Sequence, residues 1–259
     1  MKKYVKDLTI SEVSFPHERY VLLKLTDTEK QLPDILPGQF VEVKVEGSPG
    51  TFLRRPISIN YVDREKNQLW LLIAMVGEGT RTLGRLKPGD TLNLVFPLGN
   101  GFSPMRKKGE KVLLIGGGVG VAPLLEYGKV LKEQGAQPVF LLGARSEKDL
   151  LLLEMFKSIS DVYLTTEDGS AGEKGFVTQH SILATSHFDR ISVCGPKPMM
   201  QSVARYARQT ATPCEVSLEN LMACGLGACL CCVEKTVRGN VCVCQEGPVF
   251  DINDLTWNI

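Results

Sequence analysis

The sequence carries almost no net charge, because 30 Lys and Arg residues oppose 29 Asp and Glu residues. A net charge of +1 over 259 residues gives no bulk attraction for nucleic acid or for an anionic membrane surface. The N-terminus lacks the apolar stretch of a secretory signal peptide. The longest uncharged apolar run, Val112 to Leu125, is too short and too rich in glycine to span a bilayer. We therefore expect no nucleic-acid partner and no membrane segment.

Cysteine, in contrast, is concentrated near the C-terminus, where six of the eight cysteines lie within twenty-one residues. Cys224, Cys229 and Cys232 form a C-x4-C-x2-C run, the plant-type spacing for a [2Fe–2S] cluster, which takes four thiolates. The glycines of the five-residue step can adopt positive φ, so that the backbone curls around the cluster and points its amides at the sulfurs. This spacing predicts an iron–sulfur centre.

The fourth ligand is either Cys242 or Cys244 from spacing alone. We favour Cys244 because the turn residues Gln245–Pro248 follow it. Cys231 and Cys242 are then spectator thiols, while Cys214 is an ordinary strand residue. Two alternatives remain: a zinc knuckle, which prefers paired CxxC steps, and a disulfide framework, which suits small secreted chains. Thiols kept as metal ligands fit a reducing interior, so we expect a cytoplasmic protein.

The first hundred residues alternate apolar and polar side chains with a period of two, which is typical of β-strands. Turns rich in proline and glycine, such as Pro37-Gly38, separate these segments. Short strands at this spacing predict a closed antiparallel barrel, with a short helix over residues 80–86. The predicted strands are Thr9–Val13, Tyr20–Leu25, Phe40–Val45, Pro56–Tyr61 and Leu69–Ala74.

Two segments of this barrel carry residues suited to binding phosphate. Arg54-Arg55-Pro56-Ile57-Ser58 offers a guanidinium that can grip a pyrophosphate through two hydrogen bonds. In Gly77-Glu78-Gly79-Thr80, glycines precede a helix whose first amides are free for an anion. Each segment also has a plain interpretation, as a solvated arginine pair and as a glycine turn.

Strands and helices alternate over the middle of the chain, which predicts a parallel sheet with ligands at the carboxyl ends of its strands. Lys111–Ile115 is apolar enough for a strand covered on both faces, and it leads into Gly116-Gly117-Gly118-Val119-Gly120 and a helix ending near Gln134. This order suits a pyrophosphate at the helix start, although the loop departs from GxGxxG at its last positions. The other predicted elements are strands at 138–142, 162–165 and 190–194, a helix at 148–157 and a helix ending near 209.

Cys194 ends the last of these strands, at the edge where ligands bind. A free cysteine is also common as a small buried apolar side chain, and the sequence leaves both interpretations open.

Taken together, these motifs resemble the ferredoxin–NADP reductase superfamily over essentially the whole chain. Within it, the chain is similar to the family of electron-transfer subunits of NAD-dependent dihydroorotate dehydrogenase B. The resemblance rests on Arg54–Ile59, Gly116–Pro123, Cys194–Met199, Met222–Cys229 and Glu246–Phe250. It implies a β plus α/β fold: an FAD-binding barrel over 1–102, a Rossmann-like NAD-binding domain over 103–212 and a [2Fe–2S] subdomain over 213–259.

The resemblance also implies roles for single residues. Arg55 would hold the FAD pyrophosphate, Ser58 would lie near the flavin ring, and Cys194 would lie near the nicotinamide–flavin contact. Ile57 stands where many members carry a tyrosine stacked on the flavin, so the sequence does not show what covers the flavin face. The other implied residues are Pro56, Ile57, Leu72, Ile73, Ala74, Gly79 and Thr80 for FAD, Gly116, Gly117, Gly118 and Gly120 for the nucleotide, and Cys224, Cys229, Cys232 and Cys244 for iron.

In the implied reaction, electrons from dihydroorotate enter the FMN of a partner subunit and cross the cluster and FAD to NAD⁺, in support of pyrimidine biosynthesis. A flavin is needed because NADH carries a hydride whereas a [2Fe–2S] cluster accepts one electron at a time. We expect the partner to be an FMN-containing dihydroorotate dehydrogenase catalytic subunit, in a hetero-oligomer with two copies of each. The alternative is a reductase subunit of another flavin and iron–sulfur complex, serving ferredoxin, sulfite reduction or an oxygenase.

Overall fold

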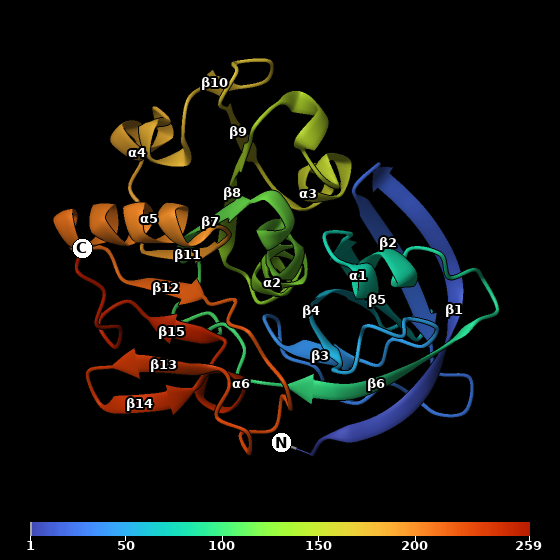
Figure 1. Cartoon of the computed structure of the whole chain (residues 1–259). Coiled ribbons are helices and arrows are strands. Elements are labelled where there is room, and N and C mark those ends of the chain that lie inside the picture. Colours follow the sequence, from blue (N-terminus) through green and yellow to red (C-terminus); the bar gives the residue numbers. More distant parts are fainter. Residues whose placement is uncertain (1) are drawn as a thin grey trace. The chain divides into compact units, whose positions relative to one another are not determined.

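The structure is a computed structural model that describes residues 2–259, and the chain divides into two compact units (Figure 1). Unit 1 comprises the chain up to Gly101 together with Glu219–Glu234 and Asn240–Pro248. Unit 2 comprises Phe102–Leu218, Lys235–Gly239 and Val249–Ile259. The C-terminal region therefore contributes to both units, and the three-part division into 1–102, 103–212 and 213–259 stays a prediction.

Unit 1 is built on a closed antiparallel barrel with the strand order β1-β2-β5-β4-β3-β6. Side chains alternate across the barrel wall, so that Leu23, Val41, Ile59 and Leu71 pack in the core. The elements are β1 (Tyr4–His17), β2 (Tyr20–Thr26), β3 (Phe40–Val43), β4 (Arg55–Asp63), β5 (Gln68–Ala74), α1 (Glu78–Leu83) and β6 (Thr91–Leu98).

The remaining part of unit 1, Glu219–Glu234 with Asn240–Pro248, holds the clustered cysteines and is called the cluster segment below. It packs on the outer face of β3 and β6, since a Cβ atom at Gly225 would lie 2.6 Å from Cγ of Glu42 and 3.1 Å from Cδ1 of Leu98. Asn100 adds a polar anchor, because its side-chain amide donates to the carbonyl of Gln245 at 2.9 Å. Its helix is α6 (Val243–Glu246), and the hairpin β13 (Val233–Thr236) and β14 (Gly239–Cys242) lies partly in this segment and partly in Lys235–Gly239 of unit 2.

Unit 2 contains a sheet with the order β10-β9-β8-β7-β11-β12-β15. Its strands are parallel except β15, which pairs antiparallel with β12. The strands are β7 (Lys111–Gly117), β8 (Gln137–Ala144), β9 (Val162–Thr166), β10 (Glu173–Lys174), β11 (Arg190–Cys194), β12 (Cys214–Ser217) and β15 (Val249–Asp251).

Two long helices cover this sheet: α2 (Ala122–Glu133) packs on β7 and β8, and α5 (Lys197–Gln209) packs on β11 and β12. Gly128 lets α2 approach closely, because a Cβ atom there would lie only 2.3 Å from the ring of Phe140. The shorter helices are α3 (Leu153–Ile159), α4 (Ile182–Thr185) and the 3-10 turns η1 (Gly118–Val121), η2 (Glu147–Asp149) and η3 (Val177–Gln179).

The predicted fold class is confirmed, with an antiparallel barrel, a parallel-sheet domain and a C-terminal cluster segment. The continuous helix predicted over 148–157 is wrong. The chain forms the turn η2 instead and then the separate helix α3, because Leu152 adopts a φ of +54°, which no α-helix accommodates. None of the helices in residues 2–259 has the length and apolar character that crossing a bilayer requires.

Candidate redox-cofactor sites

The four cysteines predicted to bind iron lie together in the cluster segment, and the sulfur of each accepts a backbone hydrogen bond. These bonds run from Leu226 to Cys224 (3.3 Å), Cys231 to Cys229 (3.5 Å), Cys244 to Cys232 (3.5 Å) and Gly227 to Cys244 (3.1 Å). Amide donors stabilise thiolates and tune an iron–sulfur centre. Gly225 and Gly227 make this arrangement possible, because their φ angles of +65° and +80° lie in the left-handed region.

The four thiols act on one another: Cys229 affects Cys224, and both Cys232 and Cys224 affect Cys244. The backbone N–H of Leu226 lowers the pKa of Cys224 to about 6, whereas burial and the neighbouring Cys232 raise the pKa of Cys244 to about 12. Among residues 2–259, no group of three or more His, Cys, Asp and Glu side chains is arranged to hold a metal ion. The residue type and the number of these four thiols fit a [2Fe–2S] cluster, which takes four thiolates.

The cysteines outside the predicted ligand set behave differently from one another. Cys231 is exposed, and Cys214 is buried in β12 of unit 2. Cys242 interacts with Cys232 in the same way as Cys244 does, so the structure brings both candidates for the fourth ligand to one partner. Cys244 differs in receiving the backbone N–H of Gly227.

The barrel brings together the residues predicted to bind the FAD pyrophosphate. A Cβ atom at Gly79 would lie 3.3 Å from Nε of Arg55 and 2.9 Å from Cγ2 of Thr51, so only glycine leaves this space open. Thr80 turns back onto its own helix start and accepts the N–H of Gly77 at 3.0 Å. Arg54 turns elsewhere and donates to the carbonyls of Glu42 and Asn93. The arginine pair therefore splits, and Arg55 is the one left beside Gly79.

The predicted flavin-ring residues divide between the two faces of the barrel wall. Ile57 and Ile73 pack against the barrel core, so they can offer a ligand outside the barrel only their backbone. Pro56 and Ser58 alternate with Ile57 along β4 and face outward. Leu72, between core residues of β5, is also directed outward, and Ala74 ends that strand half-buried.

In unit 2 the glycine loop lies directly against the end of β11. A Cβ atom at Gly120 would lie 2.6 Å from the carbonyl oxygen of Cys194, and Cys194 pairs with Gly116 across the sheet. Gly118 has a φ of +57° with open space where a side chain would be, whereas Gly117 is covered by Met199. The structure thus brings Gly116, Gly117, Gly118, Gly120 and Cys194 together at the carboxyl end of the parallel strands.

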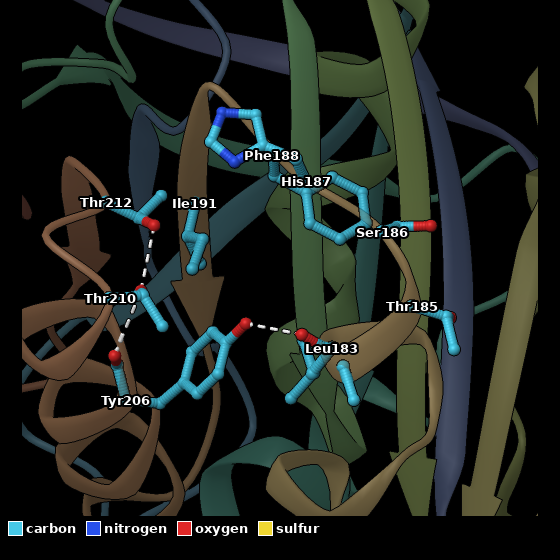
Figure 2. Close-up of a pocket in the computed structure, with 10 residues that line it drawn as sticks. Leu183, Thr185, Ser186, His187, Phe188, Ile191, Tyr206, Thr210 and Thr212 are labelled. Carbon is cyan, nitrogen blue, oxygen red and sulfur yellow. Dashed lines mark hydrogen bonds between the residues drawn. The ribbon is translucent and has the colours of Figure 1, made fainter.

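A separate pocket of about 360 Å³ lies elsewhere in unit 2, between α4 and α5 (Figure 2). Its wall includes Tyr206, whose hydroxyl donates to the carbonyl of Leu183 at 2.8 Å. None of the predicted cofactor residues lines it. The pocket is therefore separate from the predicted cofactor sites.

Sequence reasoning missed Glu42, a fully buried glutamate of β3 in contact with the cluster segment at Gly225. Within residues 2–259, neither of its carboxylate oxygens has a hydrogen-bond partner. Burial raises its pKa to about 7, against the opposing effect of Arg54. The strand pattern offered no signal, because a glutamate between two core valines looks like an ordinary solvent-facing residue.

Comparison with known proteins indicates which cofactors belong to this chain. Residues 219–256 match the family model described as the iron-sulfur cluster binding domain of dihydroorotate dehydrogenase B, and residues 114–205 match the oxidoreductase NAD-binding domain. A solved structure reported for the NADH-dependent reduced ferredoxin-NADP oxidoreductase and flavin-based electron bifurcation has a TM-score of 0.83 at 29% identity, covering 97% of this chain and 90% of that chain. The predicted cofactors, FAD, NAD and a [2Fe–2S] cluster, are confirmed by these matches.

Two curated relatives give the family. The dihydroorotate dehydrogenase B (NAD(+)) electron transfer subunit of Shouchella clausii is 38% identical over 98% of this chain and 99% of its own length. The subunit of the same name from Caldanaerobacter subterraneus subsp. tengcongensis is 41% identical over 83% of this chain and 84% of its own length. The chain therefore belongs to the family of electron transfer subunits of dihydroorotate dehydrogenase B (NAD⁺).

Proposed function

We propose that this chain transfers electrons between a partner catalytic subunit and NAD⁺, and so supports the oxidation of dihydroorotate to orotate in pyrimidine biosynthesis. The observation that carries the proposal is the cluster segment, where four correctly spaced cysteine sulfurs each accept a backbone N–H. When bound, FAD supplies the conversion between a hydride and single electrons.

The proposal gives the chain's residues positioning roles. Arg55 neutralises the diphosphate of FAD, Gly79 keeps the space beside that guanidinium free, and Ser58 lies by the flavin ring. In unit 2 the loop Gly116–Gly120 holds the nucleotide diphosphate, and Cys194 stands beside the nicotinamide. The cluster is held by Cys224, Cys229, Cys232 and Cys244.

For the partner we propose an FMN-containing catalytic subunit, in a complex with two copies of each chain, located in the cytoplasm. The cluster segment carries exposed leucines, of which Leu221 is 86% exposed and Leu226 and Leu230 follow nearby. Exposed apolar side chains in one short segment suit a docking surface. A partner bound there would lie next to the iron-binding thiols.

The direct test is to purify the chain with its partner and supply dihydroorotate and NAD⁺. NADH should form with the complex, whereas neither chain alone should support the complete reaction. Formation of NADH only when ferredoxin replaces dihydroorotate as electron donor would instead favour the ferredoxin-linked alternative. A complex without FAD would contradict the proposal.

The docking surface is tested by Leu221→Glu, which places a charge in the exposed leucine group. This variant should weaken capture of the partner, because burying an unpaired carboxylate is costly. The matched control is Val237→Glu, since Val237 is also largely exposed but belongs to unit 2. Equal capture by both variants would contradict docking at the cluster segment.

The ligand set is tested by two alanine variants. Cys244→Ala should abolish the visible absorption of the cluster, whereas Cys242→Ala should retain it, because only Cys244 receives the N–H of Gly227. Iron and acid-labile sulfide per chain provide the measurement. Loss of the cluster in Cys242→Ala alone would reverse the assignment.

A further inference from the structure

Phe52 is the feature of unit 1 that its packing leaves unexplained. It lies in the loop between β3 and β4 and is 93% exposed, so the barrel core gains nothing from this ring. Single exposed apolar side chains are common on protein surfaces, so the exposure of Phe52 points to a role only through the position of its loop.

The loop is held on the side of α1. The hydroxyl of Ser48 donates to Oε1 of Glu78 at 2.9 Å and shares a hydrogen bond with Oγ1 of Thr51 at 2.7 Å. Thr51 in turn lies against Gly79, where a Cβ atom would come within 2.9 Å of its Cγ2. The residue before Phe52 is therefore fixed at the proposed diphosphate site.

The other side of Phe52 is tied to the same site. Nη1 of Arg55 donates to the carbonyl of Leu53 at 3.2 Å and to the carbonyl of Arg54 at 3.3 Å. The backbone around Phe52 is thus attached to Arg55 and to the start of α1 on its two sides. The exposed ring belongs to a supported loop next to the guanidinium.

Ser58 and Arg55 lie on β4, where an extended chain rises about 3.3 Å per residue and separates the two residues by about 10 Å. Phe52 lies in the loop before β4, where the chain bends at Leu53 and stays close to Arg55. With the flavin ring beside Ser58 and the diphosphate at Arg55, the adenosine that is joined to the diphosphate lies within reach of the loop that carries Phe52. FMN ends at its phosphate and has nothing to place there.

From the attachment of this loop beside Arg55 and Gly79 we propose that Phe52 binds the adenine of FAD by stacking and makes this flavin site select FAD over FMN. The inference rests on the proposed function only in taking the flavin site from it. Stacking requires no hydrogen-bond partner, since each base offers a π face to an aromatic ring.

The test compares two flavins on the same protein. The full chain is freed of flavin and titrated with FAD and with FMN, and the Kd of each is measured by flavin fluorescence. Phe52→Ala should raise the Kd for FAD about tenfold or more, from the usual effect of removing one base–aromatic stack, and should leave the Kd for FMN unchanged. Phe52→Trp should keep the affinity for FAD, because it restores a stacking surface.

Phe15→Ala is the matched control, because Phe15 is an exposed phenylalanine of the same unit, in β1. It should change neither affinity. Equal weakening of both flavins by Phe52→Ala would show that the ring only supports the loop, and no change in FAD affinity would show that it faces something else. Either result would overturn the assignment of Phe52 while FAD binding by the unmodified chain, and the proposed function, still stand.

Discussion

Two buried glutamates of this chain stand in opposite situations. Glu42 in β3 of unit 1 is 0% exposed and Glu215 in β12 of unit 2 is 6% exposed. Each belongs to a four-residue strand of which every residue is buried. Burial therefore does not distinguish the two glutamates. They differ in their hydrogen-bond and ion-pair partners.

Glu215 is surrounded by donors. It accepts hydrogen bonds from the hydroxyls of Ser192 at 2.8 Å and Tyr127 at 3.2 Å and from the N–H of Ser103 at 3.3 Å. The guanidinium of Arg190, itself buried, lies 3.7 Å away. This network ties the start of unit 2 to its sheet, and a satisfied buried carboxylate of this kind is structural.

Glu42 lacks the hydrogen-bond donors that surround Glu215. Its oxygens have no hydrogen-bond partner within residues 2–259, and its side chain adjoins the cluster segment at Gly225. A buried carboxyl without partners lowers the stability of the fold when it is ionised. The comparison teaches that unit 2 uses its buried glutamate as a fixed connection, whereas unit 1 keeps one that is poorly stabilised beside the iron-binding loop.

The largest effect is expected from Glu215→Ala. The variant removes three accepted hydrogen bonds and leaves Arg190 with Glu110 as its remaining carboxylate, so unfolding should become easier by about 3–5 kcal/mol. Urea denaturation followed by circular dichroism measures it. The control is Lys107→Gln, which breaks an exposed ion pair with Asp189 and should change stability very little. If both variants lost the same amount of unfolding free energy, the contrast drawn here between Glu215 and Glu42 would have no basis.

The second prediction concerns the pH dependence caused by Glu42. Burial raises its pKa from 4.5 to about 7, so the folded iron-free chain binds this proton more tightly than the unfolded chain does. The contribution of Glu42 to stability should fall as the pH rises from about 4.5 to about 7 and should level off above that. Because Cys224, with its pKa lowered to about 6, titrates in the same range, this contribution is measured as the difference between the unmodified chain and Glu42→Gln. Glu42→Gln should abolish this fall and gain up to about 3 kcal/mol at pH 8.

Urea unfolding of the iron-free chain at pH 5 and pH 8 measures this difference. Glu46→Gln serves as control, because Glu46 is an exposed surface residue paired with Lys44. Its pH profile should follow that of the unmodified chain. If the profile of Glu42→Gln also runs parallel to the unmodified chain, Glu42 has a partner and the contrast with Glu215 disappears.

Local patterns allowed most of the fold to be predicted. The barrel strands follow from period-two alternation, and the glycine loop follows from a strand–loop–helix order that needs no distant contact. Strand β6 was not predicted, although its core residues Leu92, Leu94 and Phe96 alternate with a period of two. Cys224, Cys229 and Cys232 stand at short spacings that the sequence displays directly, whereas spacing alone leaves the fourth ligand open between Cys242 and Cys244.

Glu42 could not be predicted for a physical reason. In Phe40–Val43 the alternation assigns Glu42 to the outside of the barrel, which is correct, and the outside of a barrel is normally wet. The segment that covers it is contributed by residues near Gly225, far along the chain. Only the tertiary structure reveals that this outward face is dry.

The last prediction tests the contact between Glu42 and the cluster segment. Gly225→Ala introduces a Cβ atom 2.6 Å from Cγ of Glu42, at a residue with a φ of +65°. Gly47→Ala is the matched control, because Gly47 has a φ of +71° with nothing within 4 Å of its Cβ position. Both variants should lose about 1 kcal/mol from the backbone conformation. Gly225→Ala should lose about 1–3 kcal/mol more from overpacking.

Iron and sulfide content should separate the two variants further, because the clash displaces the loop that carries Cys224, whereas Gly47 lies in another loop. Adding Glu42→Ala to Gly225→Ala removes the clashing Cγ and should restore part of both the stability and the iron content, a non-additive result that only neighbouring residues give. Simple additivity of the two substitutions would mean that the glutamate and the cluster loop do not touch, and the low stability expected of unit 1 would then have no connection with its iron-binding residues.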